Sequence, residues 1–266
     1  MKIFAKREFV RIFLALLLVF VALQARTLEE IKESGVVKIG VLSGKNSDFY
    51  ALDRLLAERI AKDLDVELER IELVQNERID ALKSGKIDIA VANFTVTASR
   101  KKMVSFAAPY LKTYLGVLAK ESASIESEWD FHFRSVAVVS GTIGENYMQK
   151  YHNHHTLVKL YETTAEAVSA LVRGEADAFV TDNIIVIYEA KKHAGYAAKL
   201  VTMGDAEFVA PAVAKDNKEL LKWLNNEIKA LGKERFFHKI YERTLERILG
   251  GAIDVEDVLV EGDVIR

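Results

Sequence analysis

The sequence contains no cysteine among its 266 residues. This absence excludes disulfide bonds, a thiol nucleophile and thiolate ligands for a metal ion. Since no covalent cross-link is available, the fold must be held together by an ordinary hydrophobic core. The chain is long enough to bury such a core in one large domain or in two modest lobes.

A strong excess of charge of either sign is also missing. The 37 basic and 39 acidic residues give a formal net charge of −2. Removing residues 1–25, which we predict to be a signal peptide, takes away four basic residues and one acidic residue and changes the net charge to −5. A mildly acidic exported protein is a poor candidate for binding nucleic acid, so we expect no nucleic-acid partner.

The sequence has one long apolar run, and it lies at the amino terminus. The run extends from Ile12 to Leu23, Gln24-Ala25 follow it, and four basic residues precede it: Lys2, Lys6, Arg7 and Arg11. A run of this length is too short to span a bilayer, and the layout is typical of a secretory signal peptide. We therefore predict cleavage after Ala25 and a periplasmic protein, with an uncleaved membrane anchor as the alternative. Because no cysteine follows the run, we expect no lipid anchor.

One sequence pattern occurs twice. The pattern Ala-Leu-x-x-Gly-x-x-Asp-x-x-Val extends from Ala81 to Val91 and again from Ala170 to Val180. It is typical of a helix end, a glycine in the left-handed conformation, and a short apolar strand that enters a buried sheet. We therefore expect one copy in each lobe of a two-lobed protein.

Strands and helices alternate around both copies, which indicates parallel-rich sheets covered by helices. Around the first copy we predict strands at Val36–Val41, Val66–Val74 and Ile87–Val91, and helices at Asp53–Leu64 and Glu77–Lys83. Around the second we predict strands at Val136–Val139, Leu157–Leu160, Ala178–Val180 and Lys199–Met203. The helices there are predicted at Gly144–Tyr151, capped by Gly141-Thr142, at Ala165–Val172, capped by Thr164, and at Asn183–Lys192.

The last part of the chain is almost purely helical. We predict helices at Lys218–Leu231, stopped by Gly232, and at Lys233–Leu249. Because these helices need a sheet to cover, the economical solution returns the chain to the first lobe and makes the second lobe an insertion. Two strands then cross between the lobes and form a hinge, and the only two prolines, Pro109 and Pro211, border the crossings.

The predicted fold class is therefore α/β, with two lobes that are each a mixed, mostly parallel sheet flanked by helices. The predicted organisation is a signal peptide (1–25), a first lobe in two parts (26–110 and 210–266, the latter with a C-terminal extension), hinge segments (111–114 and 205–209) and an inserted second lobe (115–204).

Polar residues follow the strand of each repeat, where ligands bind in open α/β sheets. Thr95 and Arg100 follow the first copy, and Asp182 follows the second. Arginine holds a carboxylate with two parallel hydrogen bonds, the threonine hydroxyl both donates and accepts, and aspartate pairs with an ammonium. The complementary small molecule is an α-amino acid. The alternatives are a solvated basic run for Arg100 with Lys101-Lys102, and a helix cap for Asp182.

A third element could bind the ligand carboxylate. Ser140-Gly141-Thr142-Ile143-Gly144 joins a strand to a helix, so we expect the free backbone N–H groups of Thr142 and Ile143 to point into the cleft. The alternative is an ordinary capped turn. We also expect Ser99 to cap the short helix that carries Arg100.

Signals for other chemistry are weak. His152, His154 and His155 lie in a polar loop without a nearby carboxylate, so we expect them to be solvated rather than to bind a metal. The sequence has no nucleophile elbow, phosphate loop or metalloprotease helix. We therefore predict a protein that is not an enzyme and needs no cofactor, and that acts as a monomer.

The segments Asn93–Lys102 and Val104–Tyr110 resemble the hallmark block of the polar amino-acid receptors of ABC importers, solute-binding family 3. Three further segments fit the same family in order: Val136–Thr142, Asp177–Asn183 and Phe236–Tyr241. Phe208–Val213, Phe236–Lys239 and the stretch from Val258 to Gly262 are most similar to the cysteine-binding branch and its C-terminal extension.

This resemblance implies the type II periplasmic-binding-protein fold and closure of two lobes on a free L-amino acid, such as cysteine or another small polar amino acid. The closed form is then recognised by the membrane subunits of an ABC importer. It also implies that Arg100 and the backbone N–H of Ile143 hold the ligand carboxylate. The carbonyl of Asn93, Thr95 and Asp182 would then hold the ammonium.

The chain departs from the family between Leu42 and Leu52, where a longer hairpin normally supplies an aromatic wall for the ligand side chain. Asp53 matches the family's aspartate, Gln75 stands where some members have an aromatic ring, and Phe49 or Tyr50 could replace the wall. The fold also resembles that of exported dehydratases, so a dehydratase-like enzyme is one alternative function. The shortened segment suggests another, a relative without a ligand that acts as a surface or partner-binding protein.

Overall fold

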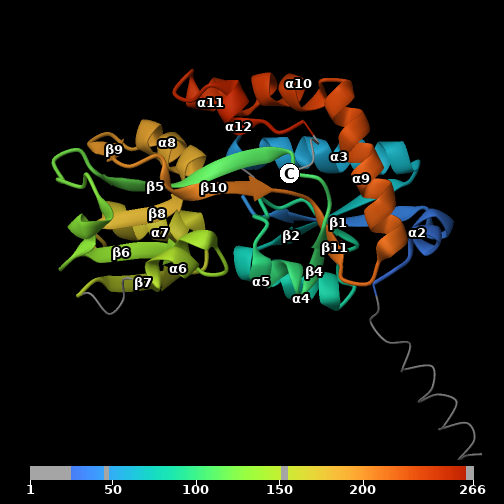
Figure 1. Ribbon diagram of the computed structural model, residues 1–266, viewed down its shortest axis with the longest axis horizontal. Helices are drawn as coiled ribbons and strands as arrows, with labels where there is room; N and C mark the ends of the chain where they lie inside the picture. Colours follow the sequence, from blue (N-terminus) through green and yellow to red (C-terminus); the bar gives the residue numbers. More distant parts are fainter. Residues whose placement is uncertain (1–24, 45–47, 151–154, 262–266) are drawn as a thin grey trace, which may run out of the picture.

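The computed structural model describes residues 25–44, 48–150 and 155–261, so the predicted signal peptide lies outside the described residues except for Ala25. The chain forms two lobes side by side, each built on its own sheet (Figure 1). The first lobe carries both the beginning and the end of the described chain, and the second lobe is formed by its middle part.

The first lobe contains a five-stranded mixed sheet. Its strands in spatial order are β2 (Glu67–Leu73), β1 (Val36–Leu42), β3 (Ile89–Ala90), β11 (Ala212–Ala214) and β4 (Val104–Phe106). Strand β1 pairs in parallel with β2 and β3, whereas β11 is antiparallel to both β3 and β4. The return of the chain as β11 places the C-terminal helices on this lobe, as the sequence predicts.

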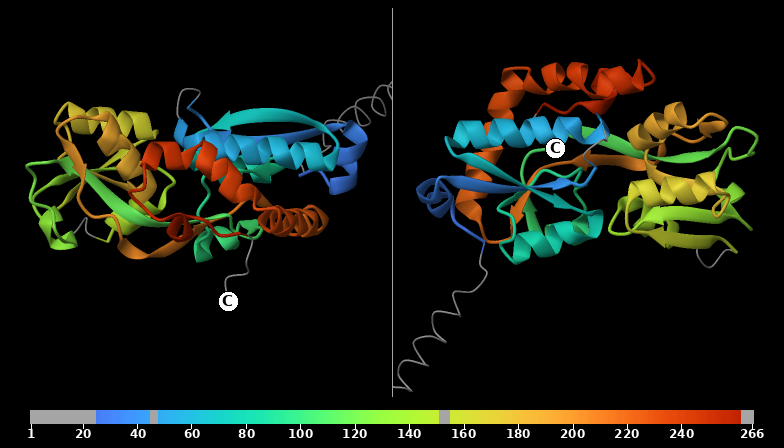
Figure 2. Two further views of the ribbon diagram at one scale, coloured as in Figure 1. Left: turned by 90° about the horizontal axis from the view of Figure 1, so that it is seen from above. Right: turned by 180° about the vertical axis from the view of Figure 1, so that it is seen from behind.

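Helices cover both faces of the first sheet. Figure 1 shows α3 (Ala51–Leu64) on one side and α4 (Arg78–Lys83) and α5 (Ala98–Lys101) on the other, and Figure 2 shows the same layers from behind. Further elements of this lobe are α2 (Leu28–Ser34), η1 (Asp48–Tyr50), η2 (Gln75–Glu77) and α9 (Lys218–Lys233). The buried stripe of α3, including Leu56, Ile60 and Leu64, packs onto β1 and β2, which explains why this amphipathic segment is helical.

The second lobe contains a six-stranded mixed sheet. Its strands are β10 (Met203–Val209), β5 (Leu111–Lys120), β8 (Ala178–Asp182), β6 (Ser135–Val139) and β7 (Leu157–Tyr161), and β9 (Tyr196–Ala198) pairs with β5. Strand β6 is parallel to β7 and β8, and β5 is antiparallel to β8. The remaining elements are η3 (Glu128–Phe131), α6 (Ile143–Met148), α7 (Thr164–Val172) and α8 (Asn183–Lys192).

Two predictions for the second lobe are wrong in detail. The cap of α7 is Thr163, whose side chain accepts the Glu166 N–H, and Thr164 is the first helical residue. The strand predicted at Lys199–Met203 is replaced by β9 and β10 on either side of it, since β9 ends at Ala198 and β10 begins at Met203.

The repeated aspartates perform the same structural task in both lobes. Asp88 accepts the backbone N–H of Lys38 in β1, and Asp177 accepts the backbone N–H of Ser135 in β6, each at 2.7 Å. The glycines of the repeat, Gly85 and Gly174, adopt φ values of 68° and 77° and end the preceding helices. Each copy therefore ties the loop after a helix end to the backbone of a strand in its own sheet, β1 in the first lobe and β6 in the second.

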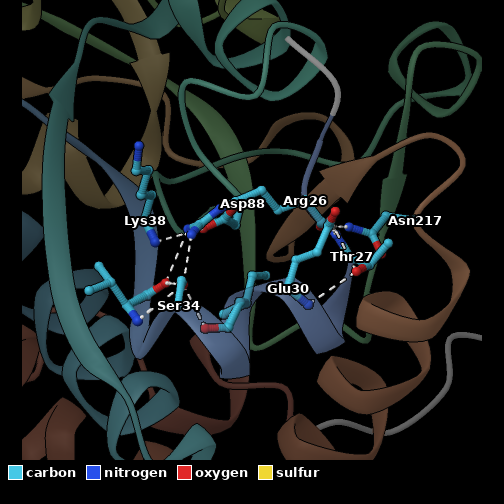
Figure 3. A network of polar contacts seen from close by, with 9 residues as sticks. Arg26, Thr27, Glu30, Ser34, Lys38, Asp88 and Asn217 are labelled. Carbon is cyan, nitrogen blue, oxygen red and sulfur yellow. Dashed lines mark hydrogen bonds and ion pairs between the residues drawn. The ribbon is translucent and has the colours of Figure 1, made fainter. Parts of the chain in front are cut away.

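Asp88 has an additional partner that Asp177 lacks among the described contacts. Figure 3 shows Arg26, just before α2, extending to Asp88, with its Nε 3.0 Å from Oδ1 and its Nη2 paired with Oδ2. The Asn217 side chain donates to the Arg26 carbonyl at 2.6 Å. The first described residues are thus tied to both parts of the first lobe.

Three segments lie next to one another where the lobes join. Strands β5 and β10 pair between Leu111–Thr113 and Glu207–Val209. The C-terminal segment after α12 (Val255–Val258) adds a bridge between Leu259 and Leu111, and the Val260 N–H donates to the Tyr110 carbonyl at 3.1 Å. The exact residue boundaries of the lobes and hinge stay a prediction.

The C-terminal helices differ from the prediction. Gly232 does not stop α9, which continues to Lys233, and the predicted helix Lys233–Leu249 is divided into α10 (Phe236–Arg243) and α11 (Leu245–Leu249). A Cβ on Gly232 would lie 2.1 Å from the Glu261 carbonyl oxygen, so this glycine permits close packing of the C-terminal segment. In the described ranges, no helix has the length and apolar character needed to cross a membrane.

We expect Asp88→Asn to lower the free energy of unfolding by about 2–4 kcal/mol, because it removes a buried carboxylate that accepts a backbone N–H and pairs with Arg26. Urea unfolding monitored by circular dichroism measures this loss. The matched variant is Asp177→Asn, whose carboxylate is exposed and accepts from Ser135. Equal losses in both variants would contradict the importance of the Arg26 contact.

Candidate ligand-binding cleft between the lobes

A small cavity lies where the two lobes meet, and it brings together seven of the eight predicted site residues. Its volume is about 10 Å³. The predicted residues that line it are Gln75, Asn93, Thr95, Arg100, Thr142, Ile143 and Asp182. Ser140 does not line it, and the Ser140 N–H donates to the Tyr161 carbonyl at 2.8 Å.

Arg100 is buried in this cavity rather than solvated in a basic run. The side chain is 5% exposed, which excludes the surface alternative. Its Nη1 donates to the Thr95 carbonyl at 2.6 Å and its Nη2 to the Gly141 carbonyl of the second lobe at 2.8 Å. Burial lowers the pKa of the guanidinium from 12.5 to about 10, against the opposing effect of the Asp182 charge.

The short helix α5 positions Arg100, and its cap differs from the prediction. Thr97 is the N-cap, and its hydroxyl accepts the Arg100 N–H at 3.2 Å. Ser99 lies inside the helix, where its hydroxyl is 3.0 Å from that of Thr97. The cap therefore fixes the backbone of the residue that supplies the guanidinium.

Arg78, the first residue of α4, is a second buried guanidinium that the sequence analysis missed. Its Nη2 donates to the same Gly141 carbonyl at 2.8 Å. Its other nitrogens donate to the carbonyl groups of Gln75, Ala92 and Asn93 at 2.7–3.0 Å. Burial, followed by repulsion from Arg100, lowers its pKa from 12.5 to about 9.

Both arginines stack on the ring of Phe94. The Arg78 guanidinium lies 4.6 Å and the Arg100 guanidinium 5.0 Å from the centre of its ring, and the ring is almost fully buried. Stacking on an aromatic face stabilises a weakly hydrated guanidinium. Phe94 therefore allows two like charges to share one end of the cleft.

Asp182 supplies the opposite charge from the end of β8. It occupies the N-cap position of α8, yet its side chain makes no cap hydrogen bond, which excludes the capping alternative. Its Oδ2 instead accepts from the side-chain amide of Asn93 in the first lobe at 2.6 Å. Burial raises the pKa of Asp182, while the Asn93 hydrogen bond and the charges of Arg78 and Arg100 oppose the rise.

Asp53 holds the Asn93 backbone in place. Its carboxylate accepts the Asn93 N–H at 2.7 Å and the Tyr110 hydroxyl at 2.5 Å. Asn93 has a φ of 43°, an unusual conformation for a residue other than glycine. Burial raises the pKa of Asp53, and the two hydrogen bonds oppose that rise. A buried network therefore connects the cleft to the start of strand β5.

The turn before α6 is built differently from the prediction. The Thr142 N–H is not free, because it donates to the Val139 carbonyl at 3.3 Å, and the Thr142 side chain caps α6 by accepting the Glu145 N–H. Ile143 is the first helical residue and lines the cavity. The Gly141 carbonyl, not the Thr142 N–H, is the group that faces the arginines.

The loop with His152, His154 and His155, which we expect to be solvated, falls mostly outside the described residues, since residues 151–154 are not described. Across the parts of the chain that are described, no group of three or more His, Cys, Asp or Glu side chains lies close enough to hold a metal ion.

The described geometry places two cationic groups and one anionic group around one cleft. Protein groups complete their hydrogen bonds across the lobe boundary: the Gly141 carbonyl contacts Arg78 and Arg100, and the Asn93 amide contacts Asp182. A carbonyl oxygen accepts as a carboxylate does, and an amide N–H donates as an ammonium does. The charges of this arrangement are complementary to those of a zwitterion.

The chain is similar to known extracellular solute-binding proteins. Residues 27–246 match the family model of the bacterial extracellular solute-binding proteins, family 3. The glutamine-binding protein GlnH of an ABC transporter from Bacillus subtilis is 28% identical over 212 residues, which are 78% of this chain and 77% of that protein.

Two crystal structures show the same fold over most of the chain. The L-cysteine solute receptor of Neisseria gonorrhoeae has a TM-score of 0.84 and 32% identity, over 88% of this chain and 100% of that one. The cysteine-binding protein of Campylobacter jejuni has a TM-score of 0.83 and 33% identity, over 88% and 98%. These similarities confirm the predicted two-lobed periplasmic-binding-protein fold and the resemblance to this family.

We expect Gly141→Ala to hold the lobes farther apart, because a Cβ at this position would lie 2.7 Å from the Asn76 Cα in the other lobe. Small-angle X-ray scattering should then give a larger radius of gyration. Gly174→Ala is the matched control, since Gly174 has a similar φ of 77° but no atom within 4 Å of its Cβ position. Both variants carry about 1–2 kcal/mol of backbone strain, and identical scattering from both would contradict the role of Gly141.

Proposed function

This chain belongs to family 3 of the bacterial extracellular solute-binding proteins, and from that membership we propose that it is a receptor that binds a free L-amino acid between its two lobes. One observation carries the proposal: Arg100 and Asp182, buried charges of opposite sign from different lobes, line one cleft. An α-amino acid carries the complementary carboxylate and ammonium on the same carbon atom.

Binding requires an exchange of partners. A cavity of about 10 Å³ has room for about one water molecule, so an amino acid enters only when the lobes move apart. Opening removes the Gly141 carbonyl from both arginines and the Asn93 amide from Asp182. The ligand carboxylate then takes the place of the carbonyl, and the ligand ammonium takes the place of the amide.

The predicted site residues have distinct roles in this proposal. Arg100 and the Ile143 N–H hold the carboxylate, and the Asn93 carbonyl, Thr95 and Asp182 hold the ammonium. We add Arg78 as a second arm of the carboxylate clamp, because its Nη2 shares its acceptor with Arg100. Thr142 and Ser140 shape the turn, and Gln75 borders the space for the ligand side chain.

The biological role that fits this chemistry is delivery of the amino acid to the membrane subunits of an ABC importer from the periplasm. The named relatives are a glutamine-binding protein of an ABC transporter and two cysteine-binding proteins, and none of these names describes an enzyme. We therefore propose a binding protein without catalytic activity or cofactor. Cysteine is one ligand to test.

Two alternatives give different experimental results. A dehydratase-like enzyme would turn over cyclic amino-acid precursors, whereas a receptor would not. A relative without a ligand would show no thermal shift with any amino acid, although a ligand at 100 times its Kd should stabilise the protein by about 2.7 kcal/mol.

We expect isothermal titration calorimetry with all common amino acids, including cysteine and cystine, to identify at least one ligand. Arg100→Ala should then weaken its binding by about 2–5 kcal/mol, since the variant leaves the ligand carboxylate without its buried partner. Lys102→Ala is the control, because this neighbouring lysine is exposed. Tight binding by Arg100→Ala would overturn the assignment of Arg100.

We expect Arg78→Lys to reduce the preference of the protein for an amino acid over its α-carboxamide. Lysine keeps the charge but cannot reproduce the planar fork that contacts several carbonyl groups and the ligand. The ratio of the two Kd values, measured by calorimetry for the tightest ligand, reports this preference. An unchanged ratio would restrict Arg78 to a structural role.

A further inference from the structure

A second and larger cavity lies beside the small cavity that contains Arg100 and Asp182. We call the small one the anchor cavity. Its volume is about 410 Å³, and it shares Gln75, Thr164 and Ile185 with the smaller cavity. Phe49 and Tyr50 contribute to it from the first lobe, and α8 contributes from the second. The two cavities are therefore neighbours along one surface between the lobes.

One face of α8 connects the anchor to the far end of this cavity. Asp182 is the N-cap residue of α8, and Ile185, Glu189 and Lys192 follow at spacings of four and three residues, which places these three on the same side of the helix. The first lines the anchor cavity, Ile185 lines both, and the other two line the larger cavity. Glu189 thus lies about 10 Å and Lys192 about 15 Å along the helix axis from Asp182.

The middle of the cavity has an aromatic wall. Phe49 lies 5.1 Å from Tyr50 and 6.2 Å from Tyr188, measured between ring centres, and all three rings are buried. Two of these rings, Phe49 and Tyr50, are the residues that we expected to be able to replace the aromatic wall of the longer family hairpin. Such a wall suits the apolar stem of a side chain.

The far end carries one charge of each sign. Glu189 Oε1 is 3.8 Å from Lys192 Nζ, and Glu189 Oε2 is 3.2 Å from His193 Nε2. The Lys192 ammonium also lies 4.7 Å from the centre of the Tyr188 ring. A separation of 3.8 Å exceeds a hydrogen bond, and a carboxylate accepts about four hydrogen bonds, so both groups can contact a ligand.

We propose that this cavity receives the ligand side chain and selects long side chains whose polar end carries no net charge and both donates and accepts hydrogen bonds. The proposal rests on the amino-acid receptor function proposed above. A side-chain amide fits this description, and so does a second amino-acid head.

The paired charges explain why both signs of net charge are disfavoured. A cationic end would pair with Glu189 but meet Lys192, and an anionic end would pair with Lys192 but meet Glu189. A short side chain, such as that of serine or cysteine, does not extend to either group.

Calorimetry on the full-length mature protein with L-glutamine, L-glutamate, L-arginine and L-serine tests the proposal. We expect glutamine to bind about tenfold or more tightly than glutamate and arginine. Glu189→Gln should shift the ratio toward glutamate, and Lys192→Met should shift it toward arginine. The matched control is Glu175→Gln, which removes an exposed carboxylate of the same lobe that pairs with Arg173.

The outcomes separate this inference from the function on which it rests. Serine affinity should stay the same in every variant, because its side chain ends near the anchor. If serine or another amino acid binds but neither variant changes the glutamate and arginine ratios, the side-chain assignment is wrong and the receptor function stands. If no amino acid binds the wild-type protein, both are overturned.

Discussion

The burial of charge where the lobes meet is the constraint from which the rest of the site follows. Arg78, Arg100, Asp53 and Asp182 are each at most 6% exposed. An ionised group without partners in such a place is very costly, so each one must be hydrogen-bonded. Within the part of the chain that is described, every buried side-chain nitrogen and oxygen has a partner. Several of those partners come from the opposite lobe, so the charges hold the lobes together.

Because the same buried charges already hold the lobes together, the binding free energy available to a ligand is limited. In the proposed mechanism an amino acid replaces the Gly141 carbonyl and the Asn93 amide, and it adds few new hydrogen bonds to the charged groups. Its affinity is therefore a difference between two sets of contacts, because a ligand shifts an equilibrium only by its differential interaction. The Asp53 network extends this coupling, since Tyr110 joins the cleft to the strand that leaves the first lobe and to the C-terminal segment beside it.

The sequence was sufficient to predict the architecture and the main charges because both depend on local patterns. The repeat predicted two equivalent helix-to-strand junctions, and the charges lie close after them, Asp182 at the end of β8 and Arg100 in the short helix α5 that comes after β3. Arg78 could not be predicted because a charged pair such as Glu77-Arg78 is common at the start of surface helices. Only the tertiary fold shows that the Arg78 side chain is buried. Ser99 and Thr164 were mistaken for caps because another hydroxyl residue lies close by, at Thr97 and Thr163. Gly232 was mistaken for a stop because a glycine needed for close packing has the same sequence signal.

In the proposed site the two ends of α8 have different roles, and both roles depend on buried or paired charges. The groups at its amino end recognise atoms that all amino acids share, so in the proposed site they supply affinity without discrimination. Discrimination must then come from the distal pair, whose members are too far from each other to satisfy one another completely. A pair of opposite charges rejects each kind of ion through the member of like sign, which is selection against the wrong ligands rather than optimisation for one. The short segment between Leu42 and Leu52 leaves Phe49 and Tyr50 to form the wall opposite this helix, so the length of that segment and the charges of α8 together define the space that a side chain can occupy.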